Sequence, residues 1–289
     1  MGYSARYHAV SLVAVFLALA IGILIGAEFG GDTLNDTRKD LERSLTGNLE
    51  DARDRADQLG GELGRANEFA ERVYPVMVRD QLDGKRIAVL AFGDLPGGDA
   101  DAIEEALQPT GAHLVGIGVV REPVDLRGLA GDLSKTRFAD IAENPETVTA
   151  FGAGVGRQIV IGGTLLDRVR GHLFSRASGN FGRLDGVIVV RDQPDEMGPV
   201  QRQSAGQLES GLIGGVVATR APAVGVEDTG TDDSSISFFQ GNDLSSVDDL
   251  DLTAGQLAMV YSLLGAEGSF GVKGSADRLL PDLLAPGEL

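Results

Sequence analysis

The chain has 289 residues, enough for one large domain or two modest ones with a buried core. Its usage of 43% hydrophobic and 24% charged residues is ordinary for a globular protein and excludes collagen-like or wholly disordered chains. The 43 acidic residues against 25 basic ones give a net charge of -18, which would repel a phosphate backbone, so we expect no nucleic-acid partner. The absence of cysteine excludes disulfide frameworks, thiolate zinc sites and thiol nucleophiles.

The first element is a candidate membrane helix over residues 9–29. Residues 9–27 read AVSLVAVFLALAIGILIGA, an uncharged run of 19 that can cross the hydrocarbon core as a helix. Arg6 precedes it and Glu28 follows it, which favours a cytoplasmic N-terminus over residues 1–8. A cleaved signal peptide is the competing interpretation, although its apolar region is normally 7 to 15 residues long. We predict an uncleaved, single-pass anchor with the rest of the chain outside the cytoplasm.

Small residues recur every four positions along this helix and end in GILIG, a GxxxG element. Small faces of this kind let two membrane helices approach closely, which predicts a transmembrane dimer. The alternative is a chance stripe, because alanine and glycine are common in membrane helices. The face consists of Ala14, Ala18, Gly22 and Gly26.

A coiled-coil stalk is predicted over residues 32–80. Apolar residues alternate at spacings of three and four, which is the seam of a heptad repeat. Three arrangements remain open: a parallel coil between two copies, a helix packed back on its own globular domain, and a seam offered to another envelope protein. Upstream leucines keep helical spacing but are out of phase, and Pro75 kinks or stops the helix. The seam comprises Leu49, Ala52, Ala56, Leu59, Leu63, Ala66, Ala70, Val73 and Met77.

The remaining periodicity predicts one doubly wound, Rossmann-like α/β domain over residues 82–273, followed by a flexible tail over 274–289. Short apolar runs alternate with helical segments, as in βαβ units with a parallel sheet. Residues 228–251 are expected to form an irregular insertion rich in Asp and Ser. Strands are predicted at residues 85–92, 113–120, 157–163, 185–190 and 223–227, and helices at 99–108, 164–174, from Pro199, and from a Thr253 cap.

No catalytic or cofactor-binding residue emerges from these segments. The loop after the first strand, residues 92–102, lacks the GxGxxG spacing, and Asp94, Asp99 and Asp101 would oppose a phosphate. No GxSxG elbow occurs, so we expect no enzyme. The acidic insertion contains seven aspartates whose spacing does not match an EF-hand, and a solvated loop is favoured over a calcium site. They are Asp228, Asp232, Asp233, Asp243, Asp248, Asp249 and Asp251.

Residues that could bind copper are few and scattered. The four methionines, Met1, Met77, Met197 and Met259, are far apart in sequence, and copper(I) prefers several sulfur ligands together. The three histidines, His8, His113 and His172, are equally scattered, although a weak copper(II) site of His and carboxylates stays open. The metal ligands are therefore unknown from sequence.

The order of segments resembles the MctB family of actinobacterial envelope proteins, which are called copper transporters. The resemblance rests on residues 7–26, the Ala/Leu stalk, SSVDDLD at 245–251 and GQLAMVYSLLGAEGSFGVK at 255–273. It implies an envelope protein with one N-terminal helix, placed in some accounts in an outer membrane and associated with copper efflux or tolerance. It implies no specific metal residues, and copper is the only ligand it suggests. A family member also resembles the coiled-coil partner in a cell-separation complex that acts on a peptidoglycan hydrolase.

Together these patterns predict a dimeric, single-pass inner-membrane protein with a role in copper transport or homeostasis. One 19-residue helix and a water-soluble domain form neither a helical bundle nor a closed barrel, so the role is expected to be indirect. The alternative is a coiled-coil scaffold that recruits or regulates a cell-wall hydrolase in cell separation. Expected partners are the membrane, a second copy of the chain through stalk and membrane helix, and another envelope protein or the hydrolase.

Overall fold

The computed structural model describes residues 4–282, and of residues 4–6, 28–38 and 40 it describes the backbone only. The chain divides into two compact units, residues 1–66 and 67–289. The predicted N-terminal segment and tail therefore lie partly outside the described residues, at 1–3 and 283–289.

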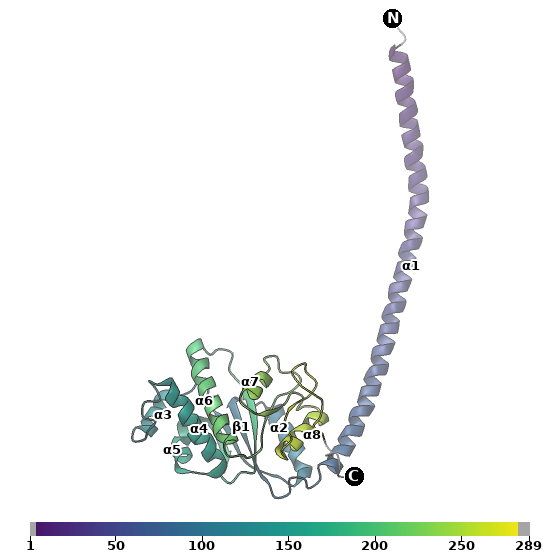
Figure 1. The fold of residues 1–289 in the computed structure, drawn as a ribbon. Coiled ribbons are helices and arrows are strands. Elements are labelled where there is room, and N and C mark those ends of the chain that lie inside the picture. The colour runs from purple at the N-terminus through teal and green to yellow at the C-terminus, as the bar shows by residue number, and fades with distance from the viewer. Residues whose placement is uncertain (1–3, 283–289) are drawn as a thin grey trace. The chain divides into compact units, whose positions relative to one another are not determined.

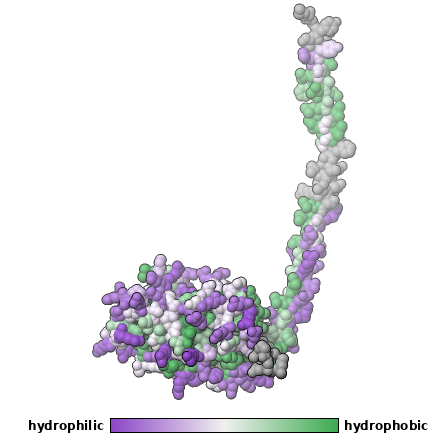
Figure 2. Space-filling view, viewed as in Figure 1, coloured by the Kyte–Doolittle hydropathy of each residue, from purple (hydrophilic) through white to green (hydrophobic). Residues whose placement is uncertain are grey.

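A single helix, α1, runs from Ser4 to Met77 (Figure 1). The predicted membrane segment and stalk are parts of this one helix. Its stretch Tyr7–Ala27 is long and apolar enough to cross a membrane, and none of it is buried within the described chain. Figure 2 shows that hydrophobic residues dominate the visible face of this stretch. Pro75 lies in the last turn, where it lacks the N–H that would bond to the carbonyl oxygen of Glu71, and the helix ends two residues later.

The end of α1 belongs to the second unit. Tyr74, Val78 and Leu82 are buried there. The Tyr74 hydroxyl donates a hydrogen bond of 2.6 Å to the carbonyl oxygen of Ala106, and burial raises the pKa of this phenol. The last turn of the helix is thus fixed to the α/β domain by packing and by a satisfied buried polar group.

The second unit is a mixed α/β domain around a seven-stranded sheet in the order β3-β2-β1-β4-β5-β6-β7. Neighbouring strands are parallel except for β3, which pairs antiparallel with β2 at the edge. The strands are β1 (Arg86–Gly93), β2 (His113–Val120), β3 (Phe174–Gly179), β4 (Gly186–Asp192), β5 (Ala223–Val226), β6 (Ser245–Val247) and β7 (Ser269–Phe270).

Helices cover the sheet on both faces (Figure 1). Alternate residues of β1 enter two separate cores, Leu90 and Phe92 on one face and Val89 and Ala91 on the other, as the two-residue period of a strand requires. The first core contains residues of α3 (Leu126–Leu133), α4 (Pro145–Ile161), α5 (Thr164–Leu173), α6 (Pro199–Val217) and α7 (Ile236–Gly241). The second contains residues of α2 (Gly97–Leu107), α8 (Thr253–Leu263) and the end of α1, and a short 3₁₀ turn, η1 (Gln108–Thr110), links α2 to β2.

One predicted strand is wrong. Residues 157–163 were expected to form a strand, but residues 157–161 are the end of helix α4. The buried residues Val148, Val155 and Ile159 share one helical face, a period that the short run IVI does not reveal by itself. A Cβ on Gly156 would lie 2.0 Å from the carbonyl oxygen of Leu212, so glycine lets α4 pack backbone to backbone against α6.

The acidic segment 228–251 also differs from its prediction, since it contains α7 and β6. Its buried Ile236 and Phe239 join the first core, which anchors the segment. The packed chain continues past the predicted domain end at residue 273. Phe270 forms a bridge with Arg278, and Leu280 packs against the second core.

Candidate functional site

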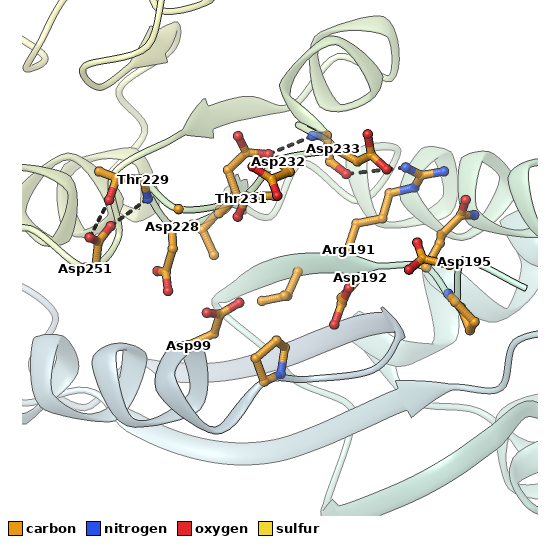
Figure 3. A pocket seen from close by; sticks show the side chains of 18 of the residues that line it. Asp99, Arg191, Asp192, Asp195, Asp228, Thr229, Thr231, Asp232, Asp233 and Asp251 are labelled. Carbon is orange, nitrogen blue, oxygen red and sulfur yellow. Dashed lines mark hydrogen bonds between the residues drawn. The ribbon is translucent and has the colours of Figure 1, made fainter.

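A pocket of about 780 Å³ opens at the carboxyl ends of β1, β4 and β5 (Figure 3). In parallel α/β sheets this edge, beside the point where the strand order reverses, is where ligands usually bind. Here β1 lies between β2 and β4, which marks such a point. Eight acidic side chains and two basic ones line the pocket, so its character is anionic. The acidic residues are Asp99, Asp192, Asp195, Glu227, Asp228, Asp232, Asp233 and Asp251, and the basic ones are Arg191 and Arg202.

Asp99 and Asp228 form a pair of carboxyl groups inside this pocket. Asp99 lies in the first turn of α2 and is only 7% exposed. Its carboxyl group is in hydrogen-bond contact with that of Asp228, and Asp228 Oδ1 is buried with no donor among the described residues. Burial first, and then the charges of Asp228, Asp192 and Asp251, raise the pKa of Asp99 to about 7. Two such groups need a proton or a cation between them.

The loop that carries Asp228 is held in place on both sides. Asp251 accepts hydrogen bonds from the Thr229 backbone nitrogen at 2.7 Å and from its hydroxyl at 2.6 Å. Lys273 Nζ lies 2.8 Å from Glu227 Oε1 and 2.9 Å from the Asp228 carbonyl oxygen. The buried charge of Glu227 is therefore compensated, whereas that of the neighbouring Asp228 is not.

A second buried charge cluster lies behind Arg191. The Arg191 Nε atom is 3.1 Å from Glu209 Oε2, and Gln193 donates to Glu209 Oε1 at 2.6 Å. Neither carboxyl oxygen of Glu122 meets a donor among the described residues. Burial, followed by the hydrogen bond and charge of Glu209, raises the pKa of Glu122 to about 9, so it is protonated at neutral pH and can donate to Glu209.

Two sequence segments, 245–251 and 255–273, pack against each other beside the pocket. Asp248 Oδ1 accepts backbone hydrogen bonds from Val272 at 2.8 Å and from Lys273 at 3.1 Å. A Cβ on Gly271 would lie 2.0 Å from this same oxygen, and the residue has a φ of +135°, so both geometry and backbone require glycine. Asp249 is fully buried, and its burial, with the charges of Asp248 and Asp251, raises its pKa to about 7.

The structure distributes the seven aspartates of the acidic insertion over three places. Four of them, Asp228, Asp232, Asp233 and Asp251, line the pocket, while Asp248 and Asp249 are buried beside β6 and Asp243 lies elsewhere. Among the described residues no group of three or more His, Cys, Asp or Glu side chains is placed to hold a metal ion.

The residues with copper-binding atoms lie in different surroundings: His8 is exposed, and Met1 lies outside the described residues. Met197 and Met259 are buried, and Met259 belongs to the second core. His172 Nδ1 is 2.7 Å from Asp132 Oδ2, and this hydrogen bond and charge raise the pKa of the imidazole. His113 is the exposed first residue of β2.

The predicted stalk seam is exposed over most of its length. Leu49, Leu59 and Leu63 are 52%, 64% and 63% exposed. The last positions differ, because Ala70 and Val73 are half-buried and Met77 packs against the second core of the domain. The small face of the membrane segment is exposed too, and a Cβ on Gly22 or Gly26 would meet nothing within 4 Å.

The sequence did not identify all residues of the pocket or of the buried cluster around Arg191. Asp99 was recognised only as a residue that opposes phosphate, and Asp192, Glu122 and Glu209 were missed. A signal for Asp192 was present, since it lies two positions after the buried run GVIVV, as the last residue of β4, and so at the carboxyl edge of a parallel sheet. Glu209 carries no such signal, because its burial depends on where α6 meets Arg191.

Fold and site together define a mixed α/β domain that follows a long helix with one candidate membrane span. The family model described as copper transport outer membrane protein, MctB, matches residues 3–281, nearly the whole chain. The chain belongs to this MctB family, as its N-terminal, stalk and C-terminal segments predicted. A search of curated proteins finds no match.

Proposed function

We propose that the chain supports copper homeostasis as a membrane-anchored dimer that acts through other envelope proteins. Its family membership supports a copper-related envelope role, and its apolar helix supports a membrane anchor. The observation that carries the mechanism is the exposed seam of α1, since large apolar side chains in water call for a partner surface.

A second copy is the partner that best fits this seam. Two identical heptad repeats are complementary in parallel register, and each leucine that becomes buried contributes about 1.5–3 kcal/mol. Leu59 and Leu63 are consecutive large residues of the seam, while Ala52, Ala56 and Ala66 let two helices approach closely. The small face from Ala14 to Gly26 would continue the pairing within the membrane.

The α/β domain is proposed to have a doubly wound, Rossmann-like fold. The N-terminus of the chain is proposed to lie in the cytoplasm, and the α/β domain outside it. We propose that the α/β domain binds other molecules and does not act as an enzyme. The copper role is proposed to be indirect, because Met197 and Met259 are buried in the domain and His172 is already paired with Asp132.

The alternative function is a scaffold for a cell-wall hydrolase. The same seam supports it, because an exposed heptad face in the envelope can bind a second helical protein as well as a second copy. If the chain acts in copper homeostasis, copper tolerance should depend on the seam. If it is a hydrolase scaffold, cell separation should depend on the seam.

The experiment compares three forms of the full-length protein in cells that lack their own copy. Leu59→Asp/Leu63→Asp places two carboxylates in the seam, and Gln58→Asp/Gly64→Asp places the same charges at outward heptad positions as a matched control. Copper tolerance, cell separation and chemical crosslinking are measured for each form. The proposal expects the seam variant to lose both dimer crosslinking and copper tolerance, with the control unchanged.

The outcomes separate the alternatives. Loss of cell separation with copper tolerance intact would favour the hydrolase scaffold. Copper tolerance that survives loss of the dimer contradicts the proposal that copper homeostasis works through the seam.

A further inference from the structure

The Asp99–Asp228 pair has no cation partner among the described residues, and unlike Asp249, which also has none, it lines a pocket. Glu209 is paired with Arg191, and Glu227 with Lys273. Asp99 is only 7% exposed, and its carboxyl group is in hydrogen-bond contact with that of Asp228. Burying two ionised carboxylates without a counter-charge costs free energy, so we expect a cation from outside the chain to bind there.

The pocket around this pair is too large and too loosely arranged for a single bare ion. Its volume of about 780 Å³ is typical of small-molecule sites. Figure 3 shows Asp251 on one side of the pair, and Asp192 and Asp195 on the other. The carboxylates are therefore spread along the pocket, which suits a ligand with several separated positive charges.

An alkylammonium group has the chemistry that this arrangement requires. It has three N–H donors on one charged nitrogen and can donate hydrogen bonds to oxygens of both Asp99 and Asp228. A flexible alkyl chain then allows further ammonium groups to reach Asp192 or Asp251. We propose that the pocket at the carboxyl ends of β1, β4 and β5 binds a ligand with two or more alkylammonium groups, anchored by Asp99 and Asp228.

The proton that the pair holds in the absence of ligand should compete with this cation. Burial first, and then the charges of the groups that face Asp99, raise its pKa to about 7; these groups are Asp228, Asp192 and Asp251. Because an ammonium group replaces the proton, binding should release protons near pH 7 and weaken as the pH falls to 6.

The test is calorimetric titration of the full-length protein, in neutral detergent at pH 8 and 150 mM NaCl, with spermidine. This salt concentration screens attraction between exposed charges. Wild-type protein is expected to bind spermidine saturably, and Asp99→Asn and Asp228→Asn are expected to bind at least tenfold more weakly. Asp101→Asn is the matched control, because it removes the same charge from an exposed position two residues along α2 and should bind as wild type.

Several results would overturn the proposal. These are no saturable binding, equal binding by Asp99→Asn and Asp101→Asn, or complete displacement of spermidine by equimolar Mg²⁺. Repeating the titration in two buffers of different ionisation enthalpy measures the released protons, a readout that a mere loss of folding cannot produce. A capped trilysine peptide, titrated in parallel, shows whether free polyamines or basic peptide segments are the preferred source of the ammonium groups.

Discussion

The stalk and the α/β domain differ in where their apolar and charged residues lie. Along residues 41–66 of α1 the leucines are exposed, and the exposed Arg72–Glu68 pair further along the helix joins residues one turn apart. In the domain, apolar side chains fill two cores and several carboxyl groups are buried. The stalk thus leaves its apolar seam exposed within this chain, whereas the domain buries its apolar side chains and several carboxyl groups.

The largest expected effect concerns pairing of the stalk. Because the chain has no cysteine, Ala56→Cys introduces a single thiol at the proposed seam. In a parallel dimer two such thiols face each other, so mild oxidation should convert most of the protein to a disulfide-linked dimer. Gln58→Cys, at an outward position, should stay largely monomeric. Non-reducing gels measure both, and equal crosslinking of the two variants would contradict the parallel seam.

A smaller but clear effect is expected from the buried ion pair of the domain. Glu209→Gln removes the negative charge that compensates Arg191, and should lower the free energy of unfolding by about 2–3 kcal/mol. Differential scanning calorimetry of the full-length protein measures the domain transition. Stalk crosslinking through Ala56→Cys should be unaffected in the same background. An unchanged transition would mean that Arg191 finds another partner.

The pH dependence of stability should also distinguish the α/β domain from the stalk. Asp99 and Asp249 have pKa values of about 7, raised by burial from ordinary values near 4. The folded state therefore binds more protons than the unfolded state between about pH 4 and 7, so stability falls as pH rises through this window. We expect a loss of about 2–4 kcal/mol between pH 5.5 and 8 in calorimetry. Stability that rises with pH over this range would refute the assignment.

The smallest expected effect at pH 5 is that of Glu122→Gln. Glu122, with a pKa of about 9, is protonated at pH 7, and glutamine can donate to Glu209 in its place. At pH 5 the two proteins should differ by less than about 1 kcal/mol. Between pH 5 and 9 the variant should become progressively the more stable protein, because the wild-type Glu122 ionises there only on unfolding. A strong loss at pH 7 would show that Glu122 is ionised.

Much of the domain was predictable because its strands are short apolar runs bounded by turn residues. The predicted strands at 113–120 and 185–190 coincide closely with β2 and β4, and the helix from Pro199 coincides with α6. The errors arose where a local pattern was ambiguous. The run IVI at 159–161 fits a strand or a buried helix, and only its packing against α6 decides for the helix. The polar edge strand β3 carries almost no apolar signal and was missed.

The sequence by itself determined the features that depend on near neighbours along the chain. These are the apolar span at Tyr7–Ala27, the heptad spacing from Leu49 and the family to which the chain belongs. Only the tertiary structure decided which of the many aspartates meet. Asp99 and Asp228 are 129 positions apart, and the parallel strands β1 and β5 bring their loops to one edge of the sheet. Burial and charge compensation arise from such distant encounters, so no local pattern could separate this pair from the solvated acids around it.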